Sequence, residues 1–167
     1  MIKRIGHLIN IILLSIAVLT TGSCDRHGTA WNEMDKAESL MDAKPDSALV
    51  VLENIPVSSV KGKEAAARYA LLKSMALDKN YIDTTTFDVL QPAIDYYIEH
   101  GTPDEQLRTY YCQGRIYQNK GDDDMAMQCF ILGKEHCKGI SDTLTLANLM
   151  VAQASIQYSI YKYKQQS

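Results

Sequence analysis

The chain has little of several residue types, and each shortage excludes a class of protein. Of its 167 residues only 8% are aromatic. The chain has 9 glycines and 4 prolines, and this glycine and proline content is too low for a collagen-like or low-complexity chain. Cations are also scarce, since 17 Lys and Arg stand against 20 Asp and Glu. Without a surplus of cations we expect no nucleic-acid partner. The hydrophobic share, 46%, instead suffices for one buried globular core.

The one long apolar run is too short to span a membrane. It covers residues 8–19, is interrupted only by Asn10 and Ser15, and follows Lys3 and Arg4. Twelve helical residues extend over about 18 Å, whereas the hydrocarbon core of a bilayer is about 30 Å thick. A short apolar run behind cations at the N-terminus is typical of a secretory signal peptide.

Three residues after this run indicate a lipid anchor. Gly22, Ser23 and Cys24 resemble a lipobox, although Thr21 stands where leucine is usual. The resemblance implies a lipoprotein signal peptide over residues 1–23, a diacylglycerol on the Cys24 thiol and a short tether over residues 24–30. Acyl chains would hold the mature chain firmly at a membrane. The alternative is an ordinary signal cleaved nearby, with Cys24 incidental.

Residues 31–167 have the periodicity of helices. Apolar residues recur at helical spacing in seven segments, 31–43, 46–55, 63–79, 84–100, 103–120, 122–138 and 143–164. Thr102 and Glu105 form the pattern of a capping box, and threonines 84–86 are expected to cap the fourth helix. No segment alternates with period two over the length of a strand. The predicted fold class is therefore all-α, as one helical domain.

A small residue followed three positions later by a large one recurs along the chain. The pairs are Ala37/Leu40, Ser74/Leu77, Gly114/Tyr117 and Ser155/Tyr158, spaced by 37, 40 and 41 residues. A small side chain lets the two helices of a hairpin approach closely, so this spacing predicts a repeat of helical hairpins. We expect about three hairpins plus a terminal helix.

Residues 107–138 have this pattern most fully, with Tyr110, Gly114, Tyr117, Ala126, Phe130 and Gly133. These positions resemble a tetratricopeptide repeat, although Gln113 and Asp123 depart from its pattern. With the signal and Cys24, the layout resembles tetratricopeptide-repeat lipoproteins of Gram-negative bacteria. The resemblance implies an α-solenoid in the cell envelope, on the outer-membrane or periplasmic side. Longer members continue into an output module, so an early-terminated member is one expectation.

The resemblance also implies a binding surface on the concave face, formed by the first helix of each hairpin. Five residues of the fifth predicted helix are expected there: Arg108, Tyr111, Arg115, Gln118 and Asn119. A planar guanidinium, an amphipathic ring and amide groups suit an extended or C-terminal peptide. The corresponding stripe of the third predicted helix is Arg68, Leu71 and Met75. The alternative is an ordinary solvated helix face.

No residue pattern predicts catalysis or a cofactor. His136 beside Cys137 lacks the further ligands of a zinc site, and the aspartates 122–124 are explained by a helix N-terminus. We therefore expect no metal and no enzyme. Cys112, Cys129 and Cys137 leave two alternatives open, one disulfide or buried thiols that act as small hydrophobic groups.

Three functions from different classes follow. The first is a membrane-anchored scaffold that binds a protein or peptide in the cell envelope through its concave face. The second is a structural assembly factor that docks, or self-associates, through the terminal helix, where Ile156, Ile160 and Tyr163 are expected to lack cover. The third, an envelope hydrolase, has no catalytic residues in its support.

Overall fold

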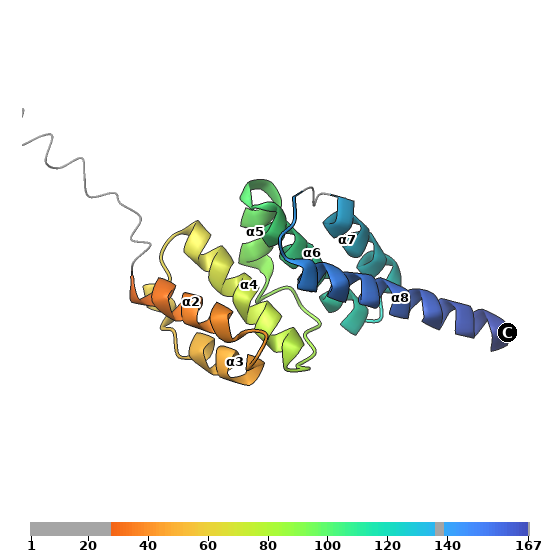
Figure 1. The fold of residues 1–167 in the computed structure, drawn as a ribbon, viewed down its shortest axis with the longest axis horizontal. Coiled ribbons are helices and arrows are strands. Elements are labelled where there is room, and N and C mark those ends of the chain that lie inside the picture. The colour runs from red at the N-terminus through yellow and green to blue at the C-terminus, as the bar shows by residue number, and fades with distance from the viewer. Residues whose placement is uncertain (1–27, 136–138, 167) are drawn as a thin grey trace, which may run out of the picture.

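The computed structural model describes residues 28–135 and 139–166. The predicted signal peptide and Cys24 lie outside these residues, as do His136 and Cys137. Over the described residues the chain forms seven α-helices and one 3-10 turn, and no strand (Figure 1). The predicted all-α fold class is confirmed.

The helices follow one another with short connections. Their bounds are α2 Thr29–Leu40, α3 Pro45–Glu53, α4 Lys63–Lys79, α5 Gln91–His100, α6 Pro103–Asn119, α7 Asp123–Glu135 and α8 Thr143–Gln166, with the 3-10 turn η2 at Val57–Ser59. All seven predicted helices are present among the described residues, and six of them begin within two residues of the predicted start.

The capping box at the start of α6 forms as predicted. The Thr102 hydroxyl accepts from the Glu105 backbone N–H at 3.4 Å, and Glu105 Oε2 accepts from the Thr102 N–H at 2.8 Å. Each side chain thereby satisfies a backbone donor that the helix itself leaves unpaired. At α7, Asp122 Oδ1 accepts from the Met125 N–H at 3.1 Å.

The predicted start of the fourth helix is wrong. The threonines at 84–86 cap no helix, because α5 begins only at Gln91 and Thr86 donates instead to Asp88 Oδ2 at 2.9 Å. Pro92 lies in the first turn of α5. A proline has no N–H to donate and its ring opposes the preceding turn, so the helix cannot extend upstream through it.

The helices pack in a regular order. Within each of the pairs α2 and α3, α4 and α5, and α6 and α7, the two helices contact each other. The first helices of these pairs also contact in series, α2 with α4, α4 with α6, and α6 with α8. We call α2, α4, α6 and α8 the inner row. Figure 1 shows this row crossing the molecule, with α8 projecting beyond the other helices.

Three of the four predicted small residues lie inside the fold. Ala37, Ser74 and Gly114 are buried. The contact at Gly114 is closest, since an added Cβ would lie 2.2 Å from Cε1 of Phe130. Ser155, on the projecting helix, is exposed.

The expectation that Ile156 lacks cover is wrong. Its side chain is 2% exposed and packs in a core with Leu107, Phe130 and Leu149, because the first half of α8 lies against α6 and α7. Farther along the helix Ile160 is 44% and Tyr163 78% exposed. Of the three residues expected to lack cover, Ile160 and Tyr163 on the last part of α8 are therefore the two that stay exposed.

The described cysteines are buried free thiols. Cys112 and Cys129 form no disulfide and lie within the packed helices. Burial, with a smaller contribution from Asp122, raises the pKa of Cys129 to about 11. The sequence left open one disulfide or buried thiols. Cys112 and Cys129 are buried thiols, and they pack as small hydrophobic groups.

Candidate binding groove

Two hollows lie along the inner row. The first, of about 660 Å³, is bordered by α2, α4, the end of α5 and the start of α6, and we call it the N-terminal hollow. The second, of about 440 Å³, is bordered by α4, α6 and α8, and we call it the C-terminal hollow. Together they form a surface to which all three helix pairs and α8 contribute.

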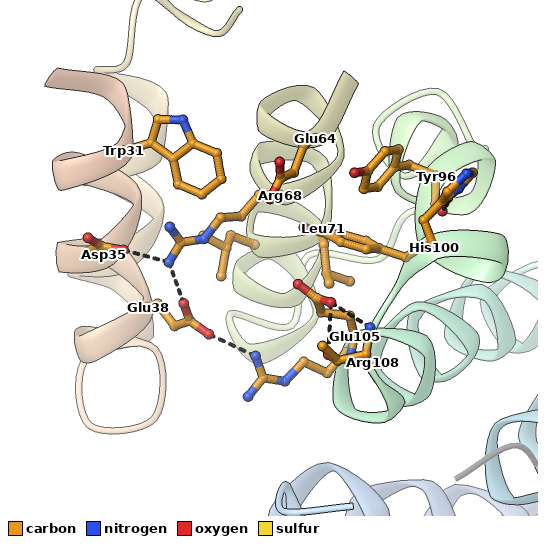
Figure 2. Close-up of a pocket in the computed structure, with 13 residues that line it drawn as sticks. Trp31, Asp35, Glu38, Glu64, Arg68, Leu71, Tyr96, His100, Glu105 and Arg108 are labelled. Atoms are coloured by element: carbon orange, nitrogen blue, oxygen red, sulfur yellow. Dashed lines mark hydrogen bonds and ion pairs between the residues drawn. The ribbon is translucent and has the colours of Figure 1, made fainter. Parts of the chain in front are cut away.

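A chain of ion pairs forms one wall of the N-terminal hollow. Arg68 Nη2 donates to Asp35 Oδ1 and to Glu38 Oε2, both at 2.7 Å, and its guanidinium lies 4.9 Å from the centre of the Trp31 ring. Glu38 also accepts from Arg108 Nη1 at 2.8 Å. One carboxylate thus bridges two cations from α4 and α6, as Figure 2 shows.

Arg108 continues this chain to the start of α8. Its Nε donates to Asp142 Oδ2 at 2.5 Å, and Asp142 also accepts from the Thr145 N–H at 2.9 Å. Burial alone would raise the pKa of Asp142, but the bonds from Thr145 and Arg108 outweigh it, so the pKa is lowered. The ionised carboxylate therefore stabilises the docking of α8 on α6.

The C-terminal hollow is organised around Asp78 of α4. Its two oxygens accept from the Tyr111 hydroxyl and from Arg115 Nε, both at 2.8 Å. Burial, with the nearby Asp78 charge, raises the pKa of Tyr111, so the phenol stays protonated as a donor. Both α6 residues are thereby fixed to α4.

The structure divides the five predicted groove residues between three places. Arg108 lines the N-terminal hollow, whereas Tyr111 and Arg115 line the C-terminal one. Gln118 lies beyond them and donates to Ser155 Oγ at 3.2 Å, while Asn119 donates to the Thr84 carbonyl at 3.2 Å. Each of the five hydrogen-bonds to another part of the chain. They do not extend free into a groove, and they hold its walls in place.

The stripe predicted on the third helix lies along both hollows. Arg68 and Leu71 line the N-terminal hollow and Met75 lines the C-terminal one. The remaining lining of the N-terminal hollow was not predicted from the sequence, and it includes Trp31, Asp35, Glu38, Glu64, Tyr96, His100 and Glu105. The only local signal was on α2, where residues 31, 35 and 38 share one helix face.

Comparisons with models of protein families, with curated proteins and with solved structures gave no match. Within residues 28–135 and 139–166 no helix has the length and apolarity to cross a bilayer. In the same ranges no three His, Cys, Asp or Glu side chains come together as metal ligands would.

Proposed function

We propose that the protein is a lipid-anchored helical-repeat scaffold of the cell envelope, which binds a protein or peptide partner through the inner row. The observation that carries the proposal is the pair of hollows bordered by α2, α4, α6 and α8. A concave surface built from successive helices is where repeat proteins take extended partners.

The packing order supports the repeat. Each of the three helix pairs buries a small residue of its first helix, Ala37, Ser74 or Gly114. These three residues also recur at similar spacing in the sequence, 37 and 40 residues apart. A tetratricopeptide-like solenoid requires both features, since one unit then stacks on the next.

Hydrogen bonds order the walls of the groove before a partner binds. Arg68, Arg108 and Arg115 are each held by carboxylates, so a partner would meet a surface whose side chains are already ordered. Ordered walls lower the entropy lost on association. We therefore assign these residues to the shape of the groove, and we propose no enzymatic activity.

Site-specific photo-cross-linking in native membranes tests the groove. A photoreactive phenylalanine analogue is placed at Tyr96 in the N-terminal hollow and at Asn148 in the C-terminal one, and at Val50 of α3 as the control. Val50 is exposed and lies outside both hollows. We expect a shared cross-linked partner from Tyr96 and Asn148 and none from Val50. Equal adducts at all three positions would argue against the groove.

The lipid anchor requires a separate test, because Cys24 lies outside the described residues. Metabolic labelling with a fatty-acid analogue should mark the wild-type chain and not Cys24→Ala. Equal labelling of the two chains would remove the anchor from the proposal and leave the groove to be judged by cross-linking.

A second candidate function has an observation of its own in α8. The projecting part of this helix exposes large side chains, namely Tyr158, Ile160, Tyr161 and Tyr163. An apolar helix surface of this kind suits an assembly factor that docks on another subunit or on a second copy. A photoreactive group at Tyr161 distinguishes the candidates, since adducts there and none at Tyr96 would favour docking through α8.

A further inference from the structure

The N-terminal hollow contains more negative than positive charge. Its lining includes four carboxylates, from Asp35, Glu38, Glu64 and Glu105, against the two guanidinium groups of Arg68 and Arg108. Charge of one sign in a concave surface concentrates its field inside the hollow. The inference that follows rests on the proposed function. The surplus of carboxylates bears on which partner segment the hollow selects.

The two cations are not available to an anionic ligand. Arg68 is bonded to Asp35 and Glu38, and Arg108 to Glu38 and Asp142. Both arginine side chains are largely buried, with 18% and 24% of their surface exposed. A carboxylate entering the hollow would therefore add negative charge beside guanidinium groups whose charge the chain's own carboxylates already compensate.

Two further carboxylates line the hollow from different helices, Glu64 from α4 and Glu105 from α6. Glu105 uses Oε2 in the capping box with Thr102. Burial raises the pKa of Tyr97, and the charges of Glu105 and Glu64 raise it further, against an opposing effect of Arg68. Tyr97, Glu64 and Glu105 all line the same hollow, so the two carboxylates border one surface.

The hollow also contains apolar and aromatic side chains. Its floor contains the buried Leu71, Leu72 and Tyr97, and its walls include the rings of Trp31 and Tyr96. Figure 2 shows Trp31 and Tyr96 on opposite sides, with Arg68 and Leu71 between them. Lysine and arginine combine an aliphatic stem with a cationic head, which matches an apolar floor with an acidic rim.

We propose that the N-terminal hollow selects a partner segment carrying lysine or arginine. The aliphatic stem lies on Leu71 and Tyr97, and the cationic head is held by Glu64 and Glu105. The ion pairs of Arg68 and Arg108 exclude segments whose inserted side chain is acidic.

The fluorescence of Trp31 provides the readout, because the chain has 1 tryptophan and it lines the hollow. The full chain in detergent is titrated with three decapeptides of alanine and glycine that differ at two positions, which hold lysine, norleucine or glutamate. We expect the lysine peptide to shift the emission with the highest affinity, and added salt to weaken its binding. Norleucine keeps the stem and removes the charge.

Two substitutions test the assigned residues. Glu64→Gln and Glu105→Gln should each weaken binding of the lysine peptide about three-fold, and together about ten-fold, as expected for partly exposed ion pairs. Glutamine at 105 can still form the capping box. Glu53→Gln on α3, an exposed glutamate outside both hollows, is the matched control and should leave the affinity unchanged.

The outcomes separate this inference from the proposed function. Three results would each overturn the charge selection. The norleucine or glutamate peptide binds as tightly as the lysine peptide or more tightly, none of the three peptides binds, or the double variant keeps the wild-type affinity. The proposed function is decided independently by cross-linking at Tyr96 and Asn148. Cross-linking to a shared partner without a lysine preference would mean that the groove binds its partner by other chemistry.

Discussion

Replacing Gly114 by alanine tests the closest helix contact in the fold. In an isolated helix the change should stabilise, because alanine has less backbone freedom to lose than glycine and gains about 0.5 to 1 kcal/mol. In this protein the added Cβ would lie 2.2, 2.6 and 2.7 Å from three ring carbons of Phe130. Real Cβ contacts are not that short, so either α6 or the ring must move.

The surroundings of Phe130 decide which effect is larger. Its ring is 0% exposed and packs against Leu107, Ala126 and Leu149, so it cannot rotate into solvent. Overpacking a core costs about 1 to 3 kcal/mol. After subtracting the helical gain, we expect Gly114→Ala to lower the free energy of unfolding by about 0.5 to 2 kcal/mol, and Gly114→Leu to lower it further.

Urea unfolding followed by circular dichroism measures this difference. With a denaturant dependence of about 2 kcal/mol per molar urea, the midpoint of Gly114→Ala should fall by roughly 0.25 to 1 M. Phe130→Leu removes the ring, so the double variant should lose less stability than the sum of the two single variants. A midpoint for Gly114→Ala at or above that of the wild type would refute the close approach of α6 and α7.

Three further predictions concern α8, the acid limit of stability and the thiols. Ile156→Glu should destabilise by several kcal/mol because it buries a charge in the core. Ile160 is exposed, so Ile160→Glu should leave the melting temperature unchanged. Equal melting temperatures for the two variants would contradict the packing of α8. The pKa of Asp142 is lowered from its ordinary 3.8, so its contribution is present above that pH and is lost as the pH falls through the lowered value. Asp142→Asn should remove that part of the acid transition in a pH series of urea melts, and an unchanged series would count against it. Cys129 is buried with its pKa raised to about 11, so in a chain with the other cysteines replaced by serine a disulfide reagent at pH 8 should label it only after unfolding.

Local residue patterns determined the secondary structure. Apolar residues at helical spacing, the capping box of Thr102 and Glu105, and glycines at helix ends act within one or two turns, so seven helices could be predicted from the sequence. The late start of α5 is also a local matter, because Pro92 by itself prevents a longer helix. The small residue at 114 indicated a close contact without naming Phe130 as its neighbour.

The composition of the groove was decided by the tertiary structure. Arg108 could be placed on the inner face from its position in the helix, but its partners Glu38 and Asp142 lie 70 and 34 residues away. Likewise the acidic rim combines Glu64 of α4 with Glu105 of α6. Ion pairs and hollows of this kind depend on the distance between helices from different hairpins. That distance is set by core packing across the whole chain, and no local pattern of residues specifies it.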